Sequence, residues 1–144
     1  MRRGLFAFTL ATIFTLGGCL GGNQHYRPSD DPLVLAHFEK IMVAEGISYR
    51  VDYQGYYRAV QAADAGRMRS AGSDALEIDP GRESVQVDEG CASLRLLQYL
   101  GDNDVVFIQQ QEAEGTFLQM TEADYVRLEV AKNFETFKTE CSGG

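Results

Sequence analysis

The sequence predicts an α+β fold in which an antiparallel sheet, built from two β-hairpins, is covered by amphipathic helices. Three observations support this prediction. Apolar residues recur at helical spacing in three segments, 32–45, 90–100 and 122–138. Two stretches of strand-forming residues are each divided by a turn that contains a glycine, Gly55 in one and Gly115 in the other. The order helix, strand, turn, strand, helix occurs in both halves of the chain.

The first helix is expected to begin at Pro32, with Asp30 or Asp31 as its N-cap, because proline is tolerated in the first turn of a helix. Gly46 is expected to end it in a left-handed conformation. The apolar stripe of this helix comprises Val34, Leu35, Phe38, Ile41 and Met42.

The first hairpin follows directly. Residues 47–52 alternate between apolar and polar side chains, which is typical of a half-buried strand, and 56–60 form the returning strand beyond Gly55. The alanine-rich segment 61–70 is a weaker helix because a glycine interrupts it. Residues 71–83 are expected to form a loop.

The second half contains a short strand, a helix, a hairpin and a long helix, at 84–88, 90–100, 104–120 and 122–138. Gly101 is expected to end the first of these helices, and the segment from Thr121 to Asp124 resembles a capping box. The segment that begins at Gly55 also aligns loosely with the one at Gly115. The halves 32–70 and 88–138 are therefore either two αββα repeats or coincidentally similar.

The N-terminus carries the features of an export signal. Arg2 and Arg3 precede an uncharged apolar run, 4–16, which is shorter than the roughly 20 residues that span a bilayer. The run ends in Leu-Gly-Gly-Cys, with the cysteine at position 19. This motif resembles the lipobox of bacterial lipoproteins, in which the cysteine accepts the acyl chains.

The resemblance implies that 1–18 are a signal peptide and that Cys19 carries palmitate or related acyl chains in the cell envelope. In a Gram-negative cell, where an inner-membrane lipoprotein usually has Asp after the cysteine, Leu20 implies the outer membrane facing the periplasm. Residues 19–31 are expected to be a flexible tether, and 32–144 a single α+β domain. The alternative is an uncleaved anchor with a chance cysteine. The first half also resembles the small αββ modules of envelope assembly proteins, a resemblance that transfers no functional residues.

Charge and cysteine content narrow the possible partners. Without 1–18 the chain has 11 basic and 21 acidic residues, a formal net charge of −10. This charge argues against nucleic acid and against docking on anionic headgroups through a basic patch.

The sequence has two cysteines besides Cys19, at positions 91 and 141. We expect Cys91 and Cys141 to form a structural disulfide in an oxidising compartment. Buried free thiols or a redox pair are the alternatives.

Catalytic and metal-binding motifs are missing from the sequence, and we expect neither enzyme activity nor a cofactor. His25 falls in the expected tether, and His37 is expected on the surface of the first helix. Asp102, Asn103 and Asp104 supply oxygens in series, but the Gly and Glu of a calcium loop are absent, so a polar turn is expected there rather than a metal site.

Tyrosine is concentrated in the first hairpin, at Tyr49, Tyr53, Tyr56 and Tyr57. Neighbours on a strand point to opposite faces, so Tyr56 and Tyr57 are not both core residues. Either these tyrosines form a contact surface, with Arg50 and Arg58 as anchors, or they reflect the preference of aromatic residues for strands. We hypothesise an envelope-anchored, non-enzymatic protein-binding or assembly factor. An inhibitor or sensor of a cell-wall enzyme or glycan, and a carboxylate-based hydrolase, are the alternatives.

Overall fold

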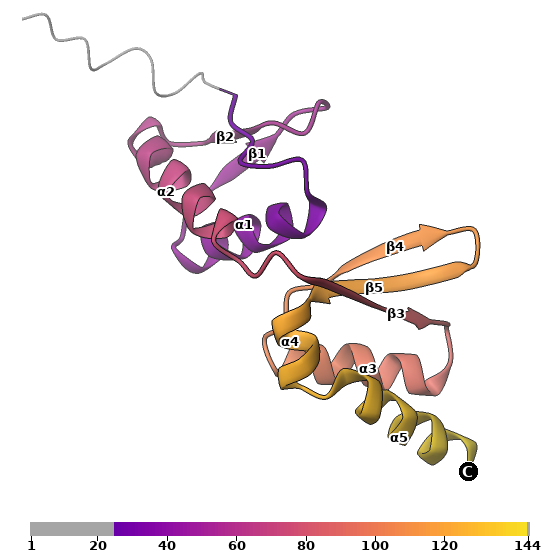
Figure 1. Cartoon of the computed structure of the whole chain (residues 1–144). Helices are drawn as coiled ribbons and strands as arrows, with labels where there is room; N and C mark the ends of the chain where they lie inside the picture. Colours follow the sequence, from indigo (N-terminus) through magenta and orange to yellow (C-terminus); the bar gives the residue numbers. More distant parts are fainter. Residues whose placement is uncertain (1–24, 144) are drawn as a thin grey trace, which may run out of the picture.

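The computed structural model describes residues 25–143. They form an α+β structure with five α-helices and two antiparallel sheets, which confirms the predicted fold class. The elements divide into a first lobe, 25–76, and a second lobe, 82–143 (Figure 1). The two predicted hairpins therefore lie in separate sheets, one in each lobe, rather than side by side in one sheet.

The first lobe consists of α1 (Pro32–Ala44), β1 (Tyr49–Val51), β2 (Tyr57–Ala59), a 3₁₀ turn (Ala62–Asp64) and α2 (Ala65–Leu76). Asp31 caps α1, with its Oδ1 accepting a 2.9 Å hydrogen bond from the amide of Leu33. Gly46 follows the helix at a φ of 70°, as predicted for a left-handed cap.

Helix α2 continues through residues that the sequence indicated as loop. Met68, Ala71, Gly72 and Ala75 form one buried face of α2. Met68, Ala71 and Ala75 pack in the same cluster as Phe38 and Met42 of α1. The packing of this face stabilises the helix, although its two glycines disfavour a helical conformation. The loop that was expected at 71–83 therefore begins only after Leu76.

The second lobe contains β3 (Arg82–Val87), α3 (Cys91–Asp102), β4 (Ile108–Glu112), β5 (Gly115–Thr121), α4 (Glu122–Arg127) and α5 (Val130–Ser142). Its sheet has the strand order β3-β5-β4, with α3 and α5 on one face (Figure 1). Thr121 caps α4 by accepting a 3.2 Å hydrogen bond from the amide of Asp124, which confirms the predicted cap.

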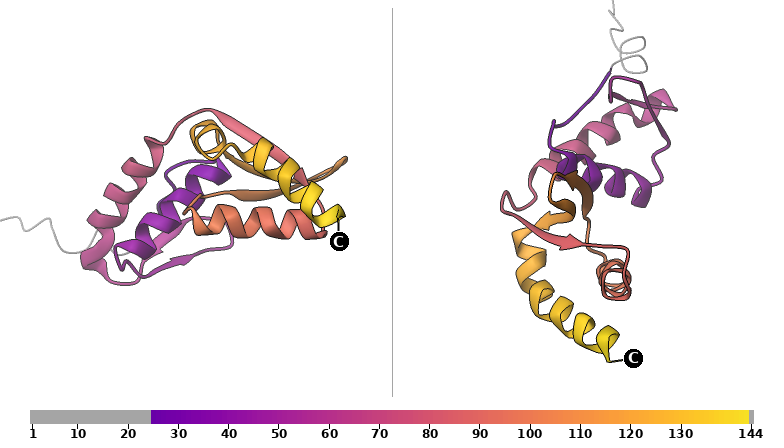
Figure 2. Two further views of the ribbon diagram at one scale, coloured as in Figure 1. Left: turned by 90° about the horizontal axis from the view of Figure 1, so that it is seen from below. Right: turned by 90° about the vertical axis from the view of Figure 1, so that its right-hand side faces the viewer.

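The long helix expected at 122–138 is two helices. Glu129 adopts a left-handed conformation, φ 46°, between α4 and α5. The left-hand view of Figure 2 shows the resulting angle, because α4 is seen there end-on and α5 from the side. The change of direction buries Leu128 and Val130 in the same cluster, where an unbroken helix would turn them to different faces.

Each lobe has its own hydrophobic cluster. Phe38, Met42 and Tyr57 are central to the first cluster, and Leu100, Leu118 and Phe134 to the second. Within each lobe, the helix before the hairpin packs against a helix that follows it. The first half therefore ends at Leu76, later than the predicted boundary, and the second lobe begins with the extra strand β3.

The two halves end their first helices in the same way. The amide of Ile47 donates a hydrogen bond to the carbonyl of Met42 at 2.9 Å, and the amide of Val105 donates one to the carbonyl of Leu100 at 3.0 Å. Gly46 and Asp104, the residues before these amides, both have positive φ. Asp104 thus takes the role expected of Gly101, which lies inside α3 instead.

The segment that precedes α1 is bound to the first lobe. The amide of Tyr26 donates a hydrogen bond to the carbonyl of Tyr57 at 3.0 Å, and the amide of Tyr57 donates one to the carbonyl of Tyr26 at 2.7 Å. The ring of Tyr26 packs edge-on against Phe38. Residues 25–31 are therefore not the free tether that the sequence indicated; the predicted signal peptide and Cys19 lie outside the described residues.

Cys91 and Cys141 form the predicted disulfide, with their Cα atoms 6.0 Å apart. The bridge joins the first residue of α3 to the last turn of α5. Over residues 25–143, the structure contains no helix that is both long and apolar enough to cross a membrane.

Candidate functional site

The first hairpin has one face in the core and one face open to solvent. Tyr49, Tyr57 and Ala59 point toward α1 and α2 and join the first hydrophobic cluster. Arg50 and Arg58 alternate with them and are exposed. We call the open side, with Arg50, Tyr56 and Arg58, together with the exposed turn residue Tyr53, the hairpin face.

Tyr57 is a core residue with a satisfied hydroxyl. It is 4% exposed and lies edge-on to Phe38 at a ring distance of 5.0 Å. Its hydroxyl donates a 2.6 Å hydrogen bond to Oε1 of Glu39. Burial, together with the nearby Glu39 carboxylate, raises the pKa of Tyr57 far above its usual range, so the phenol stays neutral.

The tyrosine cluster is thus divided between core and surface. Tyr57 is buried and its neighbour Tyr56 is 39% exposed, as the alternation of strand side chains predicts. Tyr53, in the turn, is 96% exposed. Tyr49 and Tyr57, expected on the contact surface, pack against each other inside the lobe instead, because both point to the side that α1 covers.

Asp52 organises the turn between the two strands. Its Oδ1 accepts hydrogen bonds from the amides of Gln54 and Tyr56, at 2.8 and 3.0 Å. Its Oδ2 lies 3.0 Å from Nδ1 of His25. The hydrogen bond from the Tyr56 amide is the main cause that holds the pKa of Asp52 below its usual value, with further support from Gln54 and His25.

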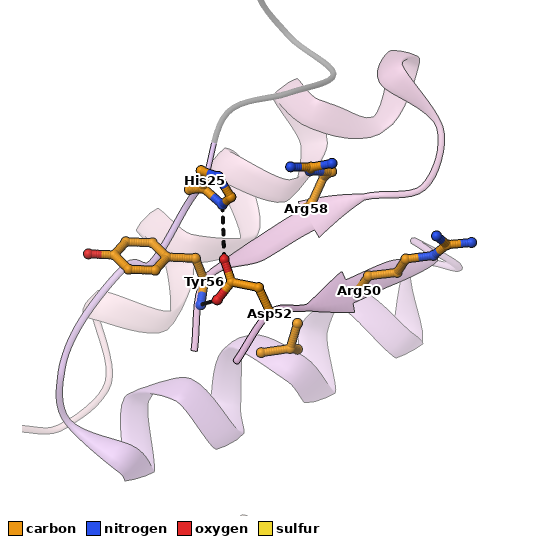
Figure 3. A pocket seen from close by; sticks show the side chains of 6 residues that line it. His25, Arg50, Asp52, Tyr56 and Arg58 are labelled. Atoms are coloured by element: carbon orange, nitrogen blue, oxygen red, sulfur yellow. Dashed lines mark hydrogen bonds and ion pairs between the residues drawn. The ribbon is translucent and has the colours of Figure 1, made fainter. Parts of the chain in front are cut away.

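A shallow hollow of about 250 Å³ lies over the hairpin face. It is lined by His25, Arg50, Val51, Asp52, Tyr56 and Arg58 (Figure 3). His25 reaches it from the segment that precedes α1, so this histidine has a fixed partner, contrary to its expected place in a free tether. Backbone pairing of Tyr26 with Tyr57 is the physical cause, because it fixes the adjoining residue beside the hairpin.

Arg50 and Arg58 are directly opposite each other in the ladder of β1 and β2. Among residues 25–143, no acidic side chain forms an ion pair with either of them. Two guanidiniums that face the same hollow can bind an anion through charge-assisted hydrogen bonds. The described lining contains no serine, threonine or cysteine.

His37 and the Asp102–Asp104 segment lie away from this hollow. His37 is half-buried in α1 rather than on its surface, and its Nε2 has no hydrogen-bond partner within the described chain. Asn103 donates a 2.7 Å hydrogen bond to the carbonyl of Tyr99, and Asp104 pairs with Lys40, so these residues end a helix. No group of three potential metal ligands occurs in the part of the chain that the structure describes.

The sequence missed His25 and Asp52 as members of the site. For Asp52 a signal was present, since an Asp three residues before a turn glycine commonly bonds to the amides that follow it. For His25 no local signal existed, because its position depends on backbone pairing with a strand more than thirty residues away.

When the chain was compared with protein families, curated proteins and solved structures, none of them showed a significant match.

Proposed function

We propose that this chain is a non-enzymatic, lipid-anchored protein of the bacterial envelope that binds a protein partner through the hairpin face. The observation that carries the binding part is the concentration of Tyr53, Tyr56 and the opposed pair Arg50 and Arg58 on the solvent side of one short hairpin. Tyrosine and arginine are the residues that most often carry binding energy at protein interfaces.

The exposed apolar area supports the same role. Tyr56 is 39% exposed on the hairpin face, and Tyr53 projects from the turn with nearly its whole side chain in solvent. Tyrosine loses little conformational entropy on binding, because its large ring turns about only two side-chain bonds. Burying these side chains against a partner would remove apolar surface from water at small entropic cost.

The proposed anchor supports a location close to the membrane. Cys19 precedes His25 by six residues. A chain of that length spans at most about 20 Å. Because His25 is bound to the hairpin turn, acyl chains on Cys19 would hold the first lobe, and with it the hairpin face, near the bilayer surface.

The anchor is tested by metabolic labelling with palmitate. We expect the natural chain to incorporate the label and Cys19→Ala to remain unlabelled and unprocessed. The variant Cys141→Ala serves as the control, because it also removes one cysteine but leaves the lipobox intact. Labelling of Cys19→Ala at the natural level would contradict the anchor.

The binding surface is tested with Tyr53→Ser and Tyr56→Ser in cells, where a tagged chain is crosslinked to its neighbours. We expect each change to reduce the yield of the specific adduct severalfold without unfolding the protein. Val126→Ser is the matched control, because Val126 is 65% exposed on α4 in the other lobe. Equal adduct yields from all three variants would exclude the hairpin face as the contact surface.

A further inference from the structure

The pairing of Arg50 with Arg58 is unfavourable in the protein alone. Like charges placed directly opposite in an antiparallel ladder destabilise the hairpin, and each of these strands is only three residues long. Substitution of either arginine by a neutral residue would relieve this repulsion. A pair that weakens its own hairpin is explained if a ligand supplies the missing negative charge.

Asp52, the acid nearest in the hollow, does not supply it. Both of its oxygens are already engaged, one with the amides of Gln54 and Tyr56 and the other with His25. Figure 3 shows Asp52 turned toward His25, while the guanidiniums of Arg50 and Arg58 diverge from it and from each other. Divergence is the expected arrangement of two long cations without a shared anion.

The surroundings of the two arginines suit a carboxylate on an apolar stem. The lining of the hollow of about 250 Å³ also includes the apolar side chain of Val51 and the ring of Tyr56. An aspartate or glutamate side chain can accept hydrogen bonds from both arginines, since each of its oxygens accepts more than one donor. The methylene groups of the same side chain can then contact the apolar part of the lining.

We propose that the hairpin face recognises an acidic segment of its protein partner, with a carboxylate bound between Arg50 and Arg58. This inference rests on the proposed function and specifies the chemistry of the partner. A protein segment is favoured over an anionic bilayer because the whole chain has a formal net charge of −8. A continuous anionic surface repels the entire molecule, whereas a single acidic segment meets only the local positive charge.

A short fluorescent peptide, Gly-Glu-Ser-Glu-Gly, tests the proposal against the full chain purified in an uncharged detergent. Fluorescence anisotropy should show saturable binding that weakens as salt is added. The double variant Arg50→Gln, Arg58→Gln should bind at least about tenfold more weakly, the scale of a lost charge-assisted hydrogen bond. Arg69→Gln is the control, because Arg69 is an exposed arginine of the same lobe outside the hollow, and its affinity should match that of the natural chain.

Two competitors identify the ligand chemistry. The peptide with both Glu replaced by Gln should not bind, and glycerophosphoglycerol, a lipid headgroup with one phosphate, should displace the Glu peptide poorly. Equal binding of the Gln peptide, no binding of the Glu peptide, or stronger binding of the headgroup than of the Glu peptide would each overturn the proposal. These titrations use no cellular partner, so they test the ligand chemistry separately from the proposed function. If the purified chain binds the Glu peptide but no protein adduct forms in cells, the result contradicts the proposed function and not the carboxylate site.

Discussion

Oδ2 of Asp31 accepts a 2.8 Å hydrogen bond from Nη2 of Arg82, and this ion pair joins the start of α1 to the start of β3. The other oxygen of Asp31 caps α1. Partial burial acts to raise the pKa of Asp31, but the hydrogen bonds from Arg82 and from the Leu33 amide outweigh it and hold the pKa below its usual value. One carboxylate thus stabilises a helix end and links the two lobes.

Asp31→Ala should therefore cost more stability than Asp31→Asn. The alanine variant loses both the helix cap and the ion pair, and a lost cap alone costs about 1 kcal/mol. The asparagine variant keeps an oxygen for the Leu33 amide and loses only the charge. Urea unfolding monitored by circular dichroism measures the difference. Asp30→Ala is the control, since Asp30 is almost fully exposed; equal midpoints for Asp31→Ala and Asp31→Asn would show that the cap contributes nothing.

His37 makes stability depend on pH. Burial, assisted by the positive charges of Lys40 and Arg82 and opposed by Asp124, lowers its pKa from 6.5. The unfolded chain therefore binds a proton more readily than the folded chain, and stability falls as the pH drops below about 6.5 toward the lowered pKa. We expect the urea midpoint to decrease between about pH 7 and pH 5, and to decrease less in His37→Gln. Parallel pH profiles for the two proteins would contradict this role of His37.

Gly72 is the point where α2 meets Tyr26. A Cβ at Gly72 would lie 2.7 Å from Cζ of Tyr26 and nearer still to its hydroxyl. Gly72→Ala should destabilise the protein by about 1–3 kcal/mol, the usual cost of overpacking. Gly66→Ala, in the same helix, meets nothing within 4 Å and should be neutral or stabilising.

A double-mutant cycle tests the cause. If the clash with Tyr26 is responsible, Gly72→Ala should cost much less in a Tyr26→Ala background than in the natural chain. The free energies of unfolding of the four proteins give the coupling. If the two substitutions change the free energy of unfolding additively, the cost of Gly72→Ala does not come from the clash with Tyr26.

Reduction of the disulfide should weaken the second lobe more than the first. Cys91 and Cys141 are 50 residues apart in the sequence, and both lie in the second lobe. A bridge that closes such a loop is worth about 2–4 kcal/mol. Hydrogen exchange should accelerate in α3 and α5 after reduction, with little change in α1 and α2. Uniform acceleration in both lobes would show that the two hydrophobic clusters unfold together. The variant Cys91→Ser, Cys141→Ser should not respond to reductant.

Local signals in the sequence predicted the fold well. Asp31 before Pro32, the glycines at 46 and 55, and the Thr121 cap each act within a few residues, and the structure confirms all of them. Elements that depend on distant partners were mispredicted. Helix α2 continues to Leu76 because α1 covers its small residues, and Glu129 breaks a helix so that its neighbours reach one core.

The candidate site was predictable only in part. Strand alternation correctly separated Tyr56 from Tyr57, but it could not say which of the two is buried, because that depends on the side on which α1 packs. The opposition of Arg50 and Arg58 follows from the register that the turn of Asp52 and Gly55 sets. His25 joined the site only through the pairing of Tyr26 with Tyr57.

The most direct test of the hairpin face is in-cell photo-crosslinking with a photoreactive residue at position 53, compared with the same residue at position 126 on α4. Mass spectrometry then identifies what each position captures. We predict one dominant protein adduct from position 53 that is absent from position 126 and is lost when Arg50→Gln and Arg58→Gln are added. The same set of adducts from both positions, or an adduct from position 53 that survives loss of both arginines, would contradict the account.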